Sequence, residues 1–289
     1  MTPAPWLAFL LLILTGLPLW QAPVTPAAAA PERVQDGVEL HRLADPGLLD
    51  PAGPVAIQAL RIDPGKVRLQ IAVAANQNPA RETVDGIAAR TQAIAAVNAG
   101  FFGLADGKPA GMLKVGGRLL GGTTRARGAV AFREHRGRTE LLFDRVTVQS
   151  RQGVYQTTMG TNAKDWRGAP FAVSGAGLLL LQGRTISDWT DERVSAAFDT
   201  TRHPRTVIGE GGGAIWLITV DGRQPELSVG MNFIELQRLA ARLGLESALN
   251  LDGGGSTTMV VRGHIVNHPS DAGGPRPVSD AIVVLPRAR

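Results

Sequence analysis

The stretch from Asn250 to Gly263, NLDGGGSTTMVVRG, combines several groups that could act on a polar substrate. Asp252 follows a short apolar run and could serve as an acid, a base or a nucleophile. Gly253–Gly255 would let the backbone approach a ligand closely, and their N–H groups could bind an anion. Ser256 and Thr257 add hydroxyl groups. We therefore expect a substrate site at this turn, with a purely structural bulge as the alternative.

Two familiar motifs do not fit this stretch. It lacks the Gly-Lys-Ser/Thr of a P-loop, and a strand rather than a helix is expected to follow it. Ser256 also lacks the Gly-x-Ser-x-Gly pattern of a nucleophile elbow.

Charged side chains gather in a second stretch, RHPRTVIGEGGG, from Arg202 to Gly213. Arg205 could bind a phosphate group with two parallel hydrogen bonds, and His203 can titrate near neutral pH. Glu210 is a candidate carboxylate at a strand boundary. Asp221 sits in an Asp-Gly turn, where a structural role is expected. The alternative for Arg202 and Arg205 is that they are ordinary solvated cations of a surface loop.

Two further stretches carry polar groups at expected strand ends. In AVNAGFF, Asn98 ends an apolar strand, and its carboxamide suits a sugar hydroxyl because it can both donate and accept. HIVNHPSDAGGPRPVSD contains Asn267, Asp271 and Arg276 before the last strand. His264 and His268 are four residues apart in an expected hairpin, so they would lie about 13 Å apart and would not share a zinc ion.

The pattern of apolar residues predicts the elements that hold these groups. Strands are expected at 67–75, 93–98, 247–251 and 278–286, with a hairpin across Arg262 and Gly263. A short helix is expected at 81–92 with Thr83 as its N-cap. A longer helix is expected after Asn232, which has capping-box spacing to Glu235. These elements predict an α+β fold: a single domain with a mixed, strand-rich sheet and a few interspersed helices.

The N-terminal region predicts export. Leu7–Leu17 is an apolar run too short to span a membrane, and the small residues Ala27–Ala30 follow it, as in a signal peptide covering 1–30. This segment has no Lys or Arg, so an uncleaved membrane anchor is the alternative. Residues 31–54 contain four prolines and are interpreted as a linker, which leaves 55–289 as the folded domain. A periplasmic or extracellular location is expected.

Composition limits the chemistry. The 289 residues include no cysteine, which excludes disulfides, thiolate nucleophiles and zinc–thiolate sites. The net charge of +5 comes from scattered residues without a long basic run, so we do not expect nucleic acid as a partner.

Taken in order, AVNAGFF, RHPRTVIG, VDGRQP, ALNLDGGGSTTMVV, VNHPSD and RPVSDAIVV resemble the phosphodiester glycosidase family over roughly residues 67–285. The resemblance implies an α+β fold and hydrolysis of a sugar-1-phosphodiester. This sequence departs from animal members in having no cysteine. The motif positions are Asn98, Arg205, Asp252, Gly253, Gly254, Ser256, Thr257, Asn267 and Arg276.

In that chemistry the phosphate leaves as an anion, so cations that hold it should matter most. Arg205 and Arg276 are the candidates, while Asp252 would stabilise the oxocarbenium-like sugar and Glu210 or Asp221 would be a second carboxylate. The polar groups expected to orient the substrate, a phosphorylated glycan of the envelope or an exopolysaccharide, are His203, Asn98, Gly253, Gly254, Gly255, Ser256, Thr257 and Asn267. No cofactor is expected, and calcium stays open.

Two other functions are compatible with the sequence. One is a binding module for phosphorylated envelope glycans, which would use the same pocket without turnover. The other is a metal-dependent phosphodiesterase with Asp252, His268 and Asp271 as ligands.

Overall fold

The computed structural model describes residues 30–149 and 153–287. The apolar run and nearly all of the predicted signal peptide therefore lie outside the described residues. Within them, no helix combines the length and the apolar character needed to cross a bilayer.

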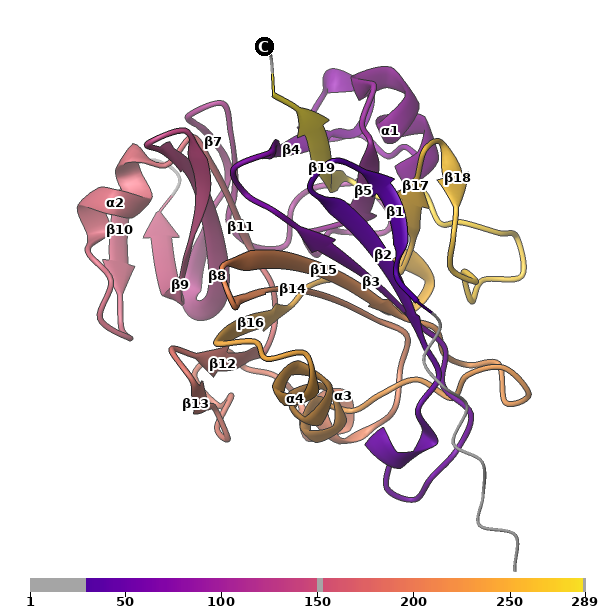
Figure 1. The fold of residues 1–289 in the computed structure, drawn as a ribbon. Coiled ribbons are helices and arrows are strands. Elements are labelled where there is room, and N and C mark those ends of the chain that lie inside the picture. The colour runs from indigo at the N-terminus through magenta and orange to yellow at the C-terminus, as the bar shows by residue number, and fades with distance from the viewer. Residues whose placement is uncertain (1–29, 150–152, 288–289) are drawn as a thin grey trace, which may run out of the picture.

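The largest sheet has eight strands in the order β1-β2-β3-β15-β14-β16-β12-β13 (Figure 1). Its strands are β1 (Glu32–Gln35), β2 (Val38–Leu43), β3 (Ile57–Ile62), β12 (Leu178–Leu181), β13 (Arg184–Thr185), β14 (Arg205–Gly211), β15 (Ala214–Val220) and β16 (Ser247–Asn250). The hairpin β14–β15 forms its centre, and β16 pairs with the other edge of β14.

A six-stranded sheet runs in the order β10-β9-β8-β11-β6-β7, on the left of Figure 1. Its strands are β6 (Leu113–Val115), β7 (Arg118–Gly121), β8 (Thr123–His135), β9 (Arg138–Gln149), β10 (Val154–Thr157) and β11 (Phe171–Ser174). The long hairpin of β8 and β9 dominates this sheet.

A five-stranded sheet runs in the order β18-β17-β5-β19-β4. Its strands are β4 (Val67–Val73), β5 (Ala95–Asn98), β17 (Met259–Val261), β18 (His264–Ile265) and β19 (Asp280–Pro286). The predicted hairpin is present: β17 and β18 pair across Arg262 and Gly263, both of which have positive φ. This sheet and the eight-stranded sheet supply the strands that hold the glycine stretch.

The expectation of one mixed sheet is wrong, because every strand pair in the described part of the chain is antiparallel and the strands divide among three sheets. Continuous apolar strands are typical of parallel sheets covered on both faces. In this protein such strands are antiparallel and are also covered on both faces, because the sheets pack on one another and helices cover their outer faces. One core contains side chains from all three sheets, among them Leu60, Val130 and Ile282.

Helices cover the outer faces of the sheets. The helix α1 (Val84–Thr91) packs Ile87 against the five-stranded sheet, and α4 (Phe233–Arg242) packs Phe233 and Leu236 against the eight-stranded sheet. Both predicted caps are present. Thr83 accepts a hydrogen bond from Gly86 N, and Asn232 forms a capping box with Glu235. Two short helices, α2 (Ala163–Gly168) and α3 (Ala196–Thr200), and three 3-10 turns, η1 (Pro46–Leu48), η2 (Ala74–Asn76) and η3 (Gly254–Ser256), complete the elements.

The interpretation of residues 31–54 as a linker is also wrong. Strand β2 pairs with β3 along its whole length, and β1 pairs with β2. Val34, Val38 and Leu40 are buried in the common core. The prolines at 46, 51 and 54 come after these strands, so they interrupt the connection to β3 rather than the strands themselves. The folded region therefore begins near Glu32.

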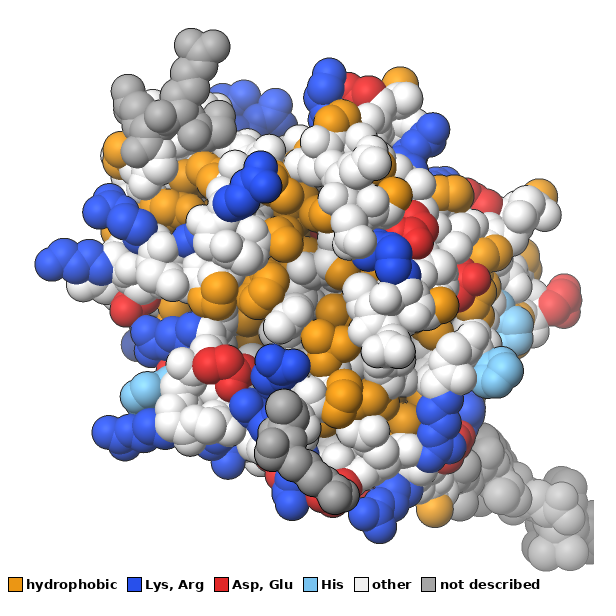
Figure 2. Space-filling view, turned by 90° about the horizontal axis from the view of Figure 1, so that it is seen from above, with side chains coloured by type: hydrophobic (Ala, Val, Ile, Leu, Met, Phe, Trp, Pro, Cys, Tyr) orange, Lys and Arg blue, Asp and Glu red, His pale blue; other side chains and the backbone are white. Residues whose placement is uncertain are grey.

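Positive charge is dispersed over the surface that Figure 2 shows. Lys and Arg side chains stand singly there, separated by uncharged and apolar side chains.

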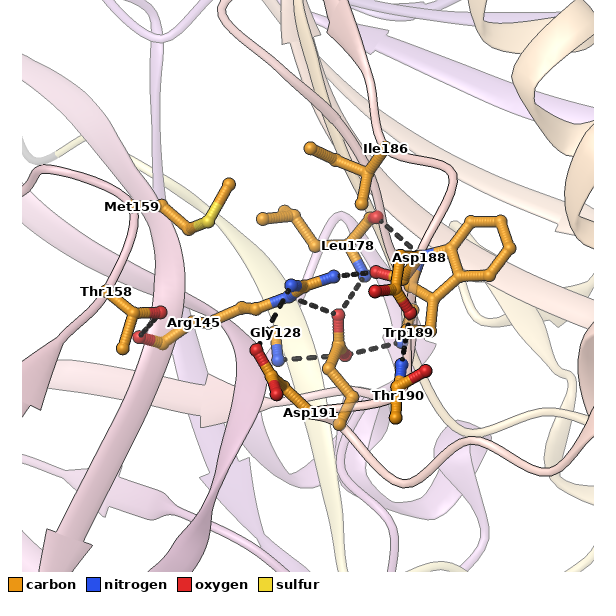
Figure 3. A network of polar contacts seen from close by, with 12 residues as sticks. Gly128, Arg145, Thr158, Met159, Leu178, Ile186, Asp188, Trp189, Thr190 and Asp191 are labelled. Atoms are coloured by element: carbon orange, nitrogen blue, oxygen red, sulfur yellow. Dashed lines mark hydrogen bonds and ion pairs between the residues drawn. The ribbon is translucent and has the colours of Figure 1, made fainter.

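A buried carboxylate joins two of the sheets. Glu192 is fully buried, and its two oxygens accept hydrogen bonds from the backbone N–H groups of Gly128, Gly177 and Leu178. Arg145 of β9 completes the network with a 3.1 Å bond from Nε to Glu192 Oε1. Figure 3 shows Arg145 beside Gly128 and Leu178, which belong to β8 and to the start of β12. The six-stranded and eight-stranded sheets are therefore linked through one charge.

We predict that Glu192→Gln lowers the free energy of unfolding by about 3–5 kcal/mol, because it leaves the Arg145 cation buried without its counter-ion. Urea unfolding followed by circular dichroism measures this. The matched control is Asp191→Asn, which also removes a partner of Arg145. Asp191 is 73% exposed and 3.9 Å from Arg145, so the control should cost less than about 1 kcal/mol. Equal losses in both variants would contradict a central role for Glu192.

Candidate active site

The glycine stretch lies between two sheets and is held by strands of both. After β16 ends, Leu251 N donates to Thr206 O of β14, and Asp252 N donates to Ala99 O just beyond β5. Gly254 N then donates to Pro204 O, ahead of β14. Asp252 is thus fixed at the junction where the ends of β5, β14 and β16 meet.

Asn98 positions this loop from inside the protein. Its Nδ2 donates to Asp252 O at 2.7 Å, and its Oδ1 accepts from Thr206 Oγ1 at 2.7 Å and from Thr258 N at 3.2 Å. The side chain is completely buried. The predicted role of Asn98 in binding substrate is therefore wrong, because its carboxamide is shielded and already bonded to three groups of the protein.

The three glycines are required by close packing. Gly254 has φ of +61°, a conformation that side-chain-bearing residues rarely adopt. A Cβ at Gly253 would lie 2.6 Å from the backbone oxygen of Pro204, so a larger residue does not fit there. A Cβ at Gly255 would lie 2.2 Å from Asp271 Oδ1 and 2.3 Å from Arg276 Nη2, so it would displace that ion pair. The expected anion-binding set of N–H groups is not free. Gly253 N donates to Asp252 Oδ1, and Gly254 N is bonded to Pro204.

Asp252 opens onto a small pocket of about 150 Å³. The pocket is lined by Phe198, His203, Pro204, Arg223, Asp252, Gly253, Gly254 and Arg276. Five of the predicted site residues thus come together: Asp252, Arg276, His203, Gly253 and Gly254. The volume suits a phosphate or one sugar ring rather than a large ligand.

Burial raises the pKa of Asp252 from its ordinary value to about 7. The Gly253 N–H and the Arg276 cation oppose the rise, and the Asp280 carboxylate adds to it. Ser256 Oγ is near enough to lower this pKa, but it makes no hydrogen bond of normal geometry with the described residues. A carboxyl group that titrates near neutral pH inside a pocket is suited to accept or donate a proton.

Two arginines line the same pocket as this carboxylate and come from different loops. Arg276 is oriented by Asp271, to which it donates from Nε and Nη2 at 2.8 Å each. Arg223 is an exposed residue of the turn after β15, and its guanidinium lies against Gly254. Sequence reasoning did not single out Arg223, although VDGRQP was one of the stretches that carried the resemblance. The two cations give the pocket a positive charge.

His203 is the remaining titratable group of the pocket. Burial lowers its pKa, and the charges of Arg205 and Arg223 lower it further. The imidazole is therefore neutral at pH 7, and its ring stacks on Phe198 with centroids 6.2 Å apart. As a neutral group it can hydrogen-bond a substrate without adding charge.

Arg205 does not line the pocket, and its predicted role in binding phosphate is wrong. Its guanidinium is buried between the rings of Phe198 and Phe233, 4.7 and 4.9 Å from their centroids. It donates to the carbonyl oxygens of Met231, Phe198 and Thr201 at 2.6 to 2.9 Å. Burial lowers its pKa to about 9. Arg205 therefore positions Phe198, a wall of the pocket, rather than the substrate.

The prediction that Glu210 is a second carboxylate beside Asp252 is also wrong. It lies five residues along β14 from Arg205, roughly 16 Å away. There it lines a different hollow together with Glu140 and Glu246. Burial raises its pKa to about 7, and the charges of Glu246 and Glu140 add to the rise.

Asp221 is buried and structural, as expected. It accepts hydrogen bonds from Asn267 Nδ2 and from both the backbone and the ring of His268. Asn267 is itself nearly buried, and its remaining bonds go to Met259 N and Thr257 O. The predicted role of Asn267 in orienting substrate is therefore wrong, because its amide holds the hairpin.

Three predicted groups lie beneath the pocket rather than on its surface. Gly255, Ser256 and Thr257 are buried and are not among its lining residues. The hydroxyls of Ser256 and Thr257 have no hydrogen-bond partner in the described structure.

Two of the three ligands suggested for a metal are engaged elsewhere: His268 pairs with Asp221, and Asp271 pairs with Arg276. Across residues 30–149 and 153–287, no three His, Asp or Glu side chains come together as a metal-binding group.

Asp280 is a second carboxylate near Asp252 that sequence reasoning missed. It opens β19, is 1% exposed and accepts a 2.7 Å hydrogen bond from Gly100 N. Burial raises its pKa, and Ser279 and Gly100 oppose the rise by hydrogen bonding. The only local signal was its position after RPVS, directly before the last strand. Because it is sealed, Asp280 acts on Asp252 through its charge.

A pocket-lining carboxylate with a near-neutral pKa, flanked by two guanidinium groups at the ends of antiparallel strands, is typical of a domain that acts on anionic substrates. The sequence match identifies the family: the model of the phosphodiester glycosidase family matches residues 91–285. The chain belongs to this family, which confirms the resemblance found in the sequence.

Curated relatives match over short stretches. A 100-residue stretch, 34% of this chain and 14% of the other, is 35% identical to the SPbeta prophage-derived protein YomE of Bacillus subtilis (strain 168). A 68-residue stretch is 37% identical to the N-acetylglucosamine-1-phosphodiester alpha-N-acetylglucosaminidase of Bos taurus, covering 23% of this chain and 12% of that protein. The matched stretches thus span less than a sixth of either relative.

Solved structures share the fold over most of the chain. The catalytic domain of zebrafish N-acetylglucosamine-1-phosphodiester alpha-N-acetylglucosaminidase, auto-inhibited by its pro-peptide, has a TM-score of 0.69 at 22% identity, covering 90% of this chain and 87% of that one. A hypothetical protein from Synechocystis gives 0.70 at 19% identity, covering 88% and 63%. An exported protein of Burkholderia pseudomallei K96243 gives 0.66 at 22% identity, covering 81% and 74%.

The raised pKa of Asp252 predicts a pH-dependent stability. The folded protein keeps the Asp252 proton up to about pH 7, whereas the unfolded chain loses it near pH 4, so ionisation costs stability as pH rises between these values. We expect Asp252→Asn to gain on the order of 2 kcal/mol in free energy of unfolding, relative to wild type, on going from about pH 4.5 to pH 8. Urea unfolding at both pH values measures this.

The control for this measurement is Asp191→Asn, which changes an exposed carboxylate. Its stability relative to wild type should be nearly the same at both pH values. A difference between Asp252→Asn and wild type that does not change with pH would show that Asp252 has an ordinary pKa.

Proposed function

We propose that this domain hydrolyses the glycosidic bond of a sugar-1-phosphodiester. The observation that carries the proposal is the convergence of Asp252, Arg223 and Arg276 on one pocket, with the pKa of Asp252 raised to about 7. The bovine relative is named for this reaction on an N-acetylglucosamine-1-phosphodiester, which supports the same bond type here.

The charges of the pocket suit a phosphate leaving group. Water adds to the anomeric carbon, the bond from that carbon to the phosphate oxygen breaks, and the phosphomonoester leaves with its negative charge. Arg276 and Arg223 would hold the phosphate and stabilise the charge that develops on it. Asp271 fixes the direction of Arg276, so the guanidinium needs little reorganisation on binding.

A single reactive carboxylate is sufficient for this reaction. Ordinary glycosidases need a second carboxyl group, about 5–9 Å away, to protonate a basic sugar alcohol as it leaves. A phosphate is a weak base and leaves without that proton. Asp252 would take the proton of the attacking water and stabilise the positive charge on the sugar. Its pKa is kept high by burial, to which the charge of the sealed Asp280 adds.

We also propose an extracytoplasmic role, on a phosphorylated glycan of the envelope or an exopolysaccharide. The apolar run Leu7–Leu17 followed by small residues supports export. The similar Burkholderia structure is of an exported protein.

We expect Asp252→Asn and Arg276→Gln to lower kcat/KM at least a hundredfold, because each removes a charge that acts in the transition state. The assay incubates the protein with a panel of sugar-1-phosphodiesters, including an N-acetylglucosamine-1-phosphodiester, and identifies the products. Arg242→Gln, an exposed arginine of α4, is the control and should retain wild-type activity. Wild-type kcat/KM should rise with pH through about 7 as Asp252 ionises.

The products decide among the functions. Free sugar and a phosphomonoester support the glycosidase. Sugar phosphate as the product would show P–O cleavage and would refute the proposed bond. Binding of the phosphodiester without turnover, equal in wild type and Asp252→Asn, would identify a glycan-binding module instead.

A further inference from the structure

A second hollow of about 700 Å³ is much larger than the Asp252 pocket. Its lining includes Thr123, Thr124, Arg125, Arg127 and Gln149. Among the described residues that line it are two arginines and no carboxylate. A hollow with this charge selects for an anionic ligand.

An irregularity in β8 produces the hollow. Thr123 pairs with Val148 and Arg127 pairs with Val146, so four steps along β8 match two steps along β9. The extra residues bulge out of the ladder, and Thr123 Oγ1 stabilises them by accepting a hydrogen bond from Arg125 N. Bulges of this kind re-aim side chains and are common beside functional sites. Here the bulge turns Arg125 outward, since it is exposed.

Arg127 has unused hydrogen-bonding capacity. Its Nε and Nη1 are shielded from solvent and have no partner among the described residues. Burial lowers its pKa and the Arg125 charge lowers it further, while the Glu192 charge opposes this. Glu192 does not meet the need, because its oxygens are already bonded to Gly128, Gly177, Leu178 and Arg145. A buried donor without an acceptor costs free energy, and a phosphate bound to the Arg127 guanidinium would recover part of it through a charge-assisted hydrogen bond.

Two aromatic rings connect this arginine to the Asp252 pocket. The Arg127 guanidinium lies over the ring of Phe101, 5.6 Å from its centroid. The Phe101 ring in turn contacts Phe198 edge-on, with centroids 6.1 Å apart, and Phe198 lines the Asp252 pocket. Arg127 is therefore within about 12 Å of that pocket wall, a separation on the scale of a disaccharide.

We propose that Arg125 and Arg127 form a second phosphate subsite, which makes the preferred substrate an anionic glycan with a second phosphate beyond the cleaved bond. This inference rests on the proposed function for the position of the cleaved bond. The Asp252 pocket takes the reacting phosphodiester, the intervening group spans the distance between the two sites, and the arginines bind the next phosphate.

The test compares two probes that differ by one phosphate: N-acetylglucosamine 1-phosphate esterified to a disaccharide, and the same compound with a second phosphate on the far sugar ring. We expect Arg127→Gln to raise KM for the second probe about tenfold and to leave KM for the first unchanged, as the loss of a charged hydrogen bond predicts. Arg118→Gln, an exposed arginine of β7, is the control. Equal KM values for both probes in wild type, or equal effects of Arg127→Gln on both, would overturn the subsite.

A binding measurement keeps this inference separate from the proposed hydrolysis. Calorimetric titration of Asp252→Asn and of Asp252→Asn/Arg127→Gln with the two-phosphate probe should show about tenfold weaker binding in the double variant. If wild type hydrolyses neither probe but this difference persists, the subsite stands and the proposed reaction fails. Equal binding by both variants, or no binding by either, would refute the subsite. Tighter binding of a uronic acid disaccharide than of the phosphate probe would refute its assignment to phosphate.

Discussion

The site depends on one buried carboxamide. Asn98, at the end of β5, holds the carbonyl of Asp252, the hydroxyl of Thr206 on β14 and the N–H of Thr258 at the same time. These three groups belong to segments more than a hundred residues apart from Asn98, so the bonds fix two sheets and the glycine loop in one register. An amide with no access to water satisfies all of them only in this arrangement. The position of the Asp252 carboxylate is therefore fixed by a residue that does not contact the substrate.

The charged side chains of the site differ in their exposure to solvent. Asp252 is half-buried and reaches the pocket, whereas Asp280 is sealed and acts on it only through space. Arg205 is likewise enclosed, between two phenyl rings, while Arg276 and Arg223 remain accessible. Burial thus separates the groups that shape the pocket from the groups that can contact a ligand, even though both sets are charged.

Local signals predicted local structure well. The capping residues Thr83 and Asn232, the β17–β18 hairpin and the strand end at Asn98 depend on a few neighbouring residues, and these predictions are confirmed. Contacts between segments far apart in the chain could not be predicted from the sequence.

Three errors show this limit. The burial of Arg205 by Phe198 and Phe233 needs three separate segments, so its charge was mistaken for a phosphate ligand. Glu210 was placed wrongly because the sequence gave no measure of its distance from Asp252 along β14. Asp280 approaches Asp252 only because β19 pairs with β5, a pairing that no short motif encodes.

The position of β19 also constrains how the molecule is made. It is the last strand in sequence, yet it lies between β4 and β5 and completes hydrogen bonding for both. While the ribosome is still extending the chain, those two strands have emerged with their inner edges unpaired, and exposed edges of this kind invite intermolecular pairing. The five-stranded sheet, and with it the site, therefore closes only after residues 280–286 have left the ribosome, so β4 and β5 lack their shared partner while most of the domain is being made.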